Sequence, residues 1–71
     1  MKYTQHNSFE YGKELAQEIL EEVEVNHGVN RACTECRHML KLLRDPSSFD
    51  SSKPFVKGLI AAREEYLKFH S

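Results

Sequence analysis

The sequence predicts an all-α fold, a small antiparallel three-helix bundle completed by homodimerisation. Apolar residues recur every three or four positions in three segments, approximately 8–27, 30–44 and 52–69, as expected for helices that each bury one face. No stretch of useful length alternates between apolar and polar residues as a half-buried strand does. A chain of 71 residues buries only ~60% of the surface that its unfolded form exposes, so a second copy would cover apolar area that one copy leaves open.

The first segment has a recognisable beginning and end. Residues 1–7 carry no helical periodicity and are interpreted as a flexible N-terminal arm, which leaves residues 8–71 as a single helical domain. Asn7 and Glu10 have the spacing of a capping box, and Gly28 suits the left-handed backbone that ends many helices. One side of this predicted helix is apolar, with Phe9, Gly12, Leu15, Ala16, Ile19, Leu20 and Val23, and the other is acidic, with Glu10, Glu14, Glu18, Glu21 and Glu22.

The second and third segments are separated by residues that disfavour helix. Asn30 is the predicted N-cap of the second helix, and Pro46 ends that helix because proline cannot continue one. Ser51 or Ser52 then caps the third helix, whose first turn tolerates Pro54. The third helix has the clearest amphipathic line, with 4-3-4-3 spacing: Phe55, Leu59, Ala62, Tyr66 and Phe69.

A short pattern of large and small residues occurs twice. The pattern Phe-x-x-Gly-x-x-x-Ala begins at Phe9 and again at Phe55. Glycine and alanine four residues apart leave a shallow groove on a helix, which lets another helix approach closely. We therefore predict that the first and third helices touch near two small-residue pairs, Gly12 with Ala16 and Gly58 with Ala62.

Composition and charge argue against several classes of protein. The net charge of −1 is far from the large positive excess of a polyanion-binding arm. The chain has no membrane-spanning apolar run and no signal-peptide segment at its N-terminus, so a cytoplasmic location is expected. Its 11 acidic residues and four histidines lie beside no nucleophile in a recognisable motif, and we therefore expect no enzymatic activity.

Cys33 and Cys36 have the spacing of a metal-binding or redox pair. A zinc site needs two further ligands, but a helix turns His38 about 160° away from Cys36, and His27 alone would leave the site incomplete. Redox activity would rely on Cys33 in the first turn of a helix, yet the thioredoxin-like βαβ pattern is absent. Both cysteines lie in the apolar stripe of the second helix, where free cysteine behaves as a small hydrophobe. The sequence therefore favours core packing, with no metal and no cofactor.

Three basic residues form a strip beside the apolar stripe of the second helix: Arg37, Lys41 and Arg44, here called the basic strip. Such a strip could contact a nucleic-acid backbone, which makes a small nucleic-acid-binding transcriptional regulator the alternative function. The connection to the third helix is about seven residues, longer than the ~3–4-residue turn of a helix-turn-helix. Antiparallel packing would instead set acidic residues of the first helix opposite the strip, namely Glu14, Glu18 or Glu21.

The third helix carries a second apolar line, Val56, Ile60 and Leu67, with Arg63 beside it; these four residues are here called the aliphatic strip. On a helical projection the strip is rotated by roughly 100–140° from the Phe55 line. It is either a second core contact or a partner surface, since arginine and aromatic residues beside aliphatic ones are enriched at interfaces. We predict a protein–protein interaction module of the kind that acts as an inhibitor or adaptor in bacteria or phages. Its predicted partners are a second copy of the chain and an unidentified protein.

Overall fold

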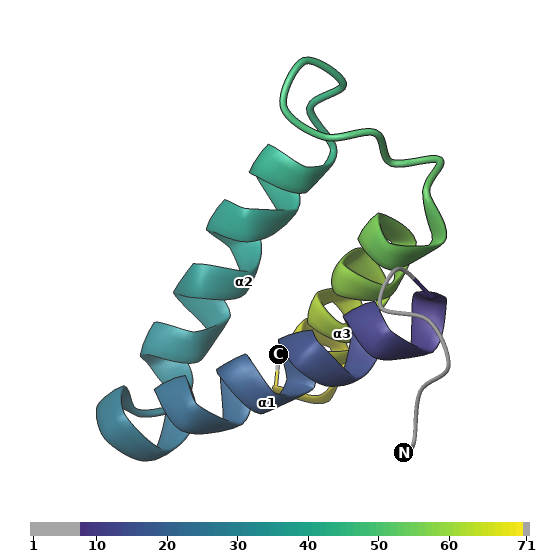
Figure 1. Ribbon diagram of the computed structural model, residues 1–71. Coiled ribbons are helices and arrows are strands. Elements are labelled where there is room, and N and C mark those ends of the chain that lie inside the picture. The colour runs from purple at the N-terminus through teal and green to yellow at the C-terminus, as the bar shows by residue number, and fades with distance from the viewer. Residues whose placement is uncertain (1–7, 71) are drawn as a thin grey trace.

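The computed structural model describes residues 8–70 and contains three helices (Figure 1). α1 spans Phe9–His27, α2 spans Val29–Leu43 and α3 spans Pro54–His70, and no strand occurs among the described residues. The prediction of three packed helices is confirmed, with each bound within two residues of the predicted one. The arm predicted over residues 1–7 lies outside the described residues.

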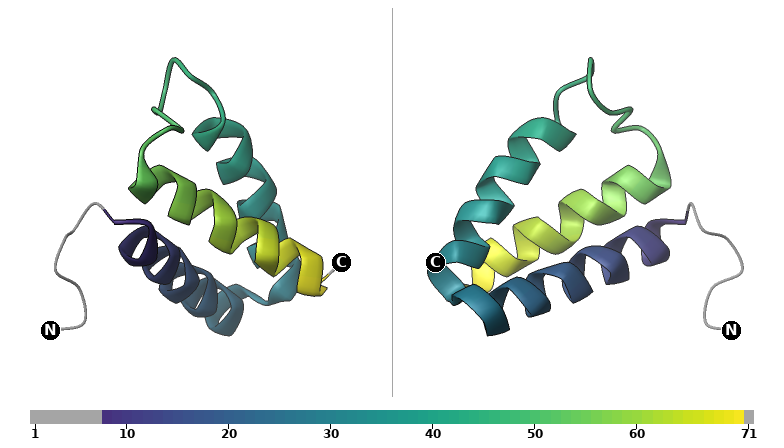
Figure 2. Two further views of the ribbon diagram at one scale, coloured as in Figure 1. Left: turned by 90° about the vertical axis from the view of Figure 1, so that its right-hand side faces the viewer. Right: turned by 60° about the vertical axis from the view of Figure 1, so that its left-hand side comes forward.

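The three helices are arranged around α3. α1 and α3 lie side by side and run in the same direction, while α2 turns back from the end of α1 and diverges from it toward its own C-terminal end (Figures 1 and 2). α3 packs against both other helices, and its more extensive contact is with α1. α3 is therefore the central helix of the bundle.

Capping interactions define both ends of α1. The Ser8 hydroxyl accepts a hydrogen bond from the Tyr11 N–H at 3.1 Å and so satisfies one of the amides that a first helical turn leaves unpaired. Gly28 follows the helix with a φ of 94°, which L side chains rarely adopt, and its N–H donates to the Glu24 carbonyl at 2.8 Å. The predicted stop at Gly28 is confirmed, but the cap is Ser8 rather than Asn7, which lies outside the described residues.

Two aspartates organise the connection between α2 and α3. The carboxylates of Asp45 and Asp50 each accept a hydrogen bond from the backbone N–H two residues later, at 3.0 Å from Ser47 and Ser52 respectively. Hydrogen bonds from the hydroxyl and amide groups of these serines hold the pKa of both carboxyl groups below the ordinary value. Pro54 then begins α3, at a position where its missing N–H breaks no helical hydrogen bond.

Two glycines bring the backbones of α1 and α3 into contact. A Cβ atom on Gly12 would collide with the carbonyl oxygen of Phe55, and one on Gly58 would collide with that of Phe9 and lie 2.7 Å from the Lys13 nitrogen. Cβ atoms essentially never approach other atoms this closely, so only glycine fits at both positions while the two helices keep this separation. The alanine four residues after each glycine is buried, and the predicted small-residue contact is confirmed.

α2 contributes cysteine and leucine side chains to the core. Cys36 and Leu43 are fully buried, and Cys33 and Leu40 retain only 7% and 6% exposure. The prediction that both thiols lie in the core is therefore confirmed.

Candidate protein-binding groove

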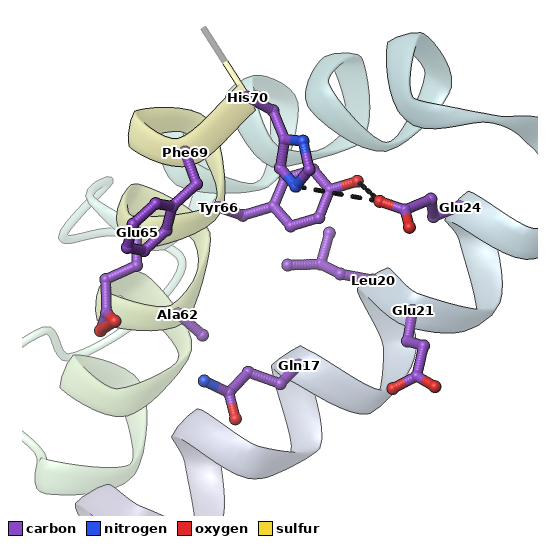
Figure 3. A pocket seen from close by; sticks show the side chains of 9 residues that line it. All are labelled: Gln17, Leu20, Glu21, Glu24, Ala62, Glu65, Tyr66, Phe69 and His70. Carbon is purple, nitrogen blue, oxygen red and sulfur yellow. Dashed lines mark hydrogen bonds and ion pairs between the residues drawn. The ribbon is translucent and has the colours of Figure 1, made fainter.

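A groove of about 310 Å³ opens between the C-terminal halves of α1 and α3 (Figure 3). It opens where the touching glycines of the N-terminal halves give way to larger side chains such as Leu20 and Tyr66. We call it the α1–α3 groove. It is lined by Gln17, Leu20, Glu21, Glu24, Ala62, Glu65, Tyr66, Phe69 and His70, and thus by no residue of α2.

The floor of the groove is apolar, and its wall includes an exposed aromatic ring. Leu20 and Ala62 lie in the floor with 3% and 2% exposure, whereas Phe69 remains 78% exposed. The amphipathic line of the third helix predicted a core position for Phe69, and this prediction is wrong. The ring borders an open groove in the last turn of α3, so most of it stays in contact with water.

A cluster of three side chains joins the C-terminal ends of α1 and α3. The Tyr66 hydroxyl donates a hydrogen bond to Glu24 Oε1 at 2.5 Å, and His70 Nε2 lies 3.9 Å from the same oxygen (Figure 3). The Tyr66 and His70 rings are in contact, with centroids 4.2 Å apart. Burial and the neighbouring Glu24 carboxylate raise the pKa of Tyr66, so the phenol remains a protonated donor at neutral pH.

Acidic side chains surround the groove. Glu21 and Glu24 stand on its α1 side and Glu65 on its α3 side. Lys13, one helical turn before Gln17, pairs with Glu65 at an N–O distance of 2.8 Å. A shallow hollow on the adjoining face of α1 adds two further carboxylates, those of Glu18 and Glu22. The groove therefore combines an apolar floor with an acidic rim.

The aliphatic strip lies mainly inside the molecule. Val56 and Arg63 are only 6% and 4% exposed, and Ile60 and Leu67 are half-buried. The expectation of a partner surface is therefore corrected for Val56 and Arg63, because a single copy of the chain buries both. The physical reason is the central place of α3: Phe55 and Tyr66 contact α1, while Arg63 points to another side of the helix and lies close to Cys36 of α2.

Arg63 is held within the interface between α2 and α3. Its Nη1 donates a hydrogen bond to the Leu59 carbonyl, one turn earlier in the same helix, at 3.0 Å. Burial lowers the pKa of Arg63, and the Cys36 sulfur of α2 lies close enough that its ionised form would oppose that shift. An arginine stays protonated even so, which means that the interface contains a buried cation.

The basic strip is exposed on the outside of α2. Arg37, Lys41 and Arg44 are all surface residues, and Arg44 forms an ion pair with Glu64 of α3. The partner of Arg44 thus comes from α3, whereas the sequence predicted a glutamate of the first helix. Since no α2 residue lines the α1–α3 groove, the molecule carries a basic surface and an acidic groove on different elements.

The two cysteines are buried free thiols. Burial raises the pKa of Cys36 to about 11, so this sulfur is protonated at neutral pH. The thiolate is the form that binds metals and attacks disulfides, and burial of Cys36 disfavours it. Within residues 8–70, no three His, Cys, Asp or Glu side chains are grouped so that they could hold a metal ion.

Comparison of the chain with protein-family models, with curated proteins and with solved structures gives no match. None of the helices within residues 8–70 has both the length and the apolar character needed to cross a bilayer. The α1–α3 groove combines side chains of two helices with an apolar floor, and it is the candidate functional site.

Proposed function

We propose that this protein is a cytoplasmic protein–protein interaction module, without enzymatic activity, whose binding site is the α1–α3 groove. The observation that supports the proposal is the exposed Phe69 ring beside the buried floor of Leu20 and Ala62. A partner that covered this ring would gain about 25 cal/mol for each Å² of apolar surface removed from water. A groove between two helices is also a common receptor for an amphipathic helix.

Self-association is one form that such binding can take. The homodimer expected through the aliphatic strip would now have to use Ile60 and Leu67, which are half-buried, or the α1–α3 groove itself. An adaptor or inhibitor would use the groove for a different protein. A dimer or an adaptor that uses the groove places Phe69 against a second chain. Ile60 and Leu67 lie roughly 160–180° around α3 from Phe69, so a dimer through them would leave this ring exposed.

Photo-crosslinking in the cells that produce the protein tests the proposal. A photoreactive phenylalanine analogue replaces Phe69, and a matched variant carries the analogue at Phe49, which is 39% exposed in the connection between α2 and α3. The expected result is a discrete adduct with a second chain from position 69 and none from position 49. Equal labelling from both positions, or no adduct from position 69, would refute the proposal.

The exposure of the basic strip supports a second candidate, a small nucleic-acid-binding transcriptional regulator. Arg37 and Lys41 would contact phosphates, whereas the charge of Arg44 is already compensated by Glu64. Binding to duplex DNA should then weaken steeply with salt and be lost in the R37E/K41E variant. A K57E variant, changed at an exposed lysine of α3, is the control and should still bind. No binding at low salt would rule this candidate out.

A further inference from the structure

We infer that the occupant of the α1–α3 groove is a basic amphipathic helix of a different protein. The inference rests on the proposed function and adds the chemistry of the partner. Three observations support it: the charge around the groove, the shape of the groove, and the poor fit of a second copy of this chain.

The charge around the groove selects a cationic ligand. Glu21, Glu24 and Glu65 form the rim, and the Glu18 and Glu22 carboxylates lie on the adjoining face of α1. Lys13 pairs with Glu65 of this rim, and the His70 ring lies near Glu24. Lysine and arginine side chains would be attracted to this rim, whereas an acidic helix or a nucleic-acid backbone would be repelled.

The shape of the groove suits a helix with one apolar face. Two parallel helices form its sides, and Leu20 and Ala62 form an apolar floor between them. A ligand helix can direct its apolar residues at this floor while its basic residues reach the rim on either side. The exposed Phe69 ring offers a further contact, because an arginine or lysine can lay its aliphatic stem or its charge against an aromatic face.

A second copy of the chain fits this groove poorly. Two grooves that faced each other would bring Glu21, Glu24 and Glu65 of both copies together, and like charges oppose such a contact. The basic strip of α2 has the right charge, but Leu40 and Leu43 are buried within their own copy. The exposed Leu42 lies roughly 100–160° around the helix from the basic strip and so cannot serve as its anchor. Neither surface supplies both an apolar anchor and basic flanks, so the partner is a different protein.

Two designed peptides test the inference on the full-length chain. Each is about 18 residues long, sufficient for an isolated helix, and carries leucines at i, i+4, i+7 and i+11. One peptide has lysines flanking the leucine stripe, and the other has glutamate in place of every lysine. Binding is followed by fluorescence anisotropy, and the site is mapped by the shifts of backbone amide signals in NMR spectra.

The basic peptide should bind and shift the amide signals of residues 17–24 and 62–70, while the acidic peptide should not bind. The double variant E21K/E65K should weaken binding by about tenfold, since each reversal replaces an exposed attraction by a repulsion. The control E10K/E35K has the same net charge but changes glutamates that do not line the groove, and it should bind within about twofold of the unmodified chain. Thermal melting confirms that both variants are folded.

Several results would overturn the inference. These are equal binding of both peptides, unchanged binding by E21K/E65K, signal shifts confined to α2, or a dimeric mass in sedimentation that Phe69→Ser abolishes. If the photoreactive analogue at Phe69 still captures a second chain in such a case, the proposed interaction function stands and only the basic helix is wrong. If that adduct is also absent, both are wrong.

Discussion

The two interfaces of α3 are built from opposite kinds of residue. Against α1, Gly12 and Gly58 remove side chains so that backbones touch. Against α2, the contact is made by side chains, including fully buried Leu43 and Cys36 and the buried Arg63. The α1–α3 contact therefore requires that two positions have no side chain, and the α2–α3 contact requires side chains that fill the space between the helices.

The difference determines how each interface fails. A backbone contact has no flexible atoms that can move aside, so any added atom forces the helices apart. A side-chain contact fails when atoms are removed, because the surrounding residues relax only partly into the cavity. Substitutions in opposite directions should therefore separate the two interfaces experimentally.

The largest effect is expected from Leu43→Ala at the α2–α3 interface. Truncating a fully buried leucine should lower the free energy of unfolding by about 3 kcal/mol, which is most of the stability of so small a domain. Urea denaturation followed by circular dichroism measures the change. Leu42→Ala is the control: Leu42 is 38% exposed, and its loss should be less than about 1 kcal/mol. Similar losses for both variants would contradict the described orientation of α2.

Gly58→Ala should have the next largest effect, at the α1–α3 interface. Its Cβ would strike the backbone of α1, at a cost of about 1–3 kcal/mol, while the better helix propensity of alanine returns up to about 1 kcal/mol. We expect a net loss of about 1–2 kcal/mol in the same urea measurement. A gain in stability, which is the ordinary outcome of Gly→Ala inside a helix, would show that the backbones do not touch.

Arg63→Met should change stability by no more than about 1 kcal/mol. Methionine keeps an apolar stem of similar length and removes a buried charge, and such replacements in interiors are often neutral or stabilising. Arg63→Ala instead loses the stem and should cost about 2 kcal/mol. If both variants were equally destabilised, the charge of Arg63, rather than its stem, would support the α2–α3 interface.

Ionisation of the Cys36 thiol should change the stability of the protein only at alkaline pH. Because burial raises the pKa of Cys36 from 9.0 to about 11, the folded chain retains a proton that the unfolded chain releases. The contribution to stability is thus complete below pH 9 and is lost as the pH rises through about 11. Urea midpoints from pH 8 to 11 should fall more steeply for the unmodified chain than for Cys36→Ala. Parallel curves would mean that this thiol is not buried in the folded state.

Local spacing was enough to predict much of the fold. The three helices, the stop at Gly28 and the inward-facing thiols follow from periodicity and backbone preference within single segments. The glycine contact was also predictable, because the pattern at Phe9 recurs at Phe55 and only small residues allow so close an approach.

The central place of α3 and the groove were not predictable in the same way. Glu24 and Tyr66 are 42 residues apart, and only the parallel pairing of α1 with α3 brings them together. The one local signal was the four-residue spacing of Tyr66 and His70, which places both rings on one side of a helix. The burial of Arg63 depends likewise on where α2 lies, which the periodicity of α3 does not specify.

Gly28 alone separates α1 from α2, whereas the connection between α2 and α3 is long. An inserted residue should therefore be damaging near the start of α2 and harmless after its end. One residue inserted after Asn30 would extend the helix and turn every later side chain by about 100° relative to α1, which would carry Leu43 out of its site. One residue inserted after Ser48 would enlarge a ten-residue exposed connection and leave the rotational phase of both flanking helices unchanged. Natural or engineered length variation should therefore be accepted in the second connection and rejected at the first.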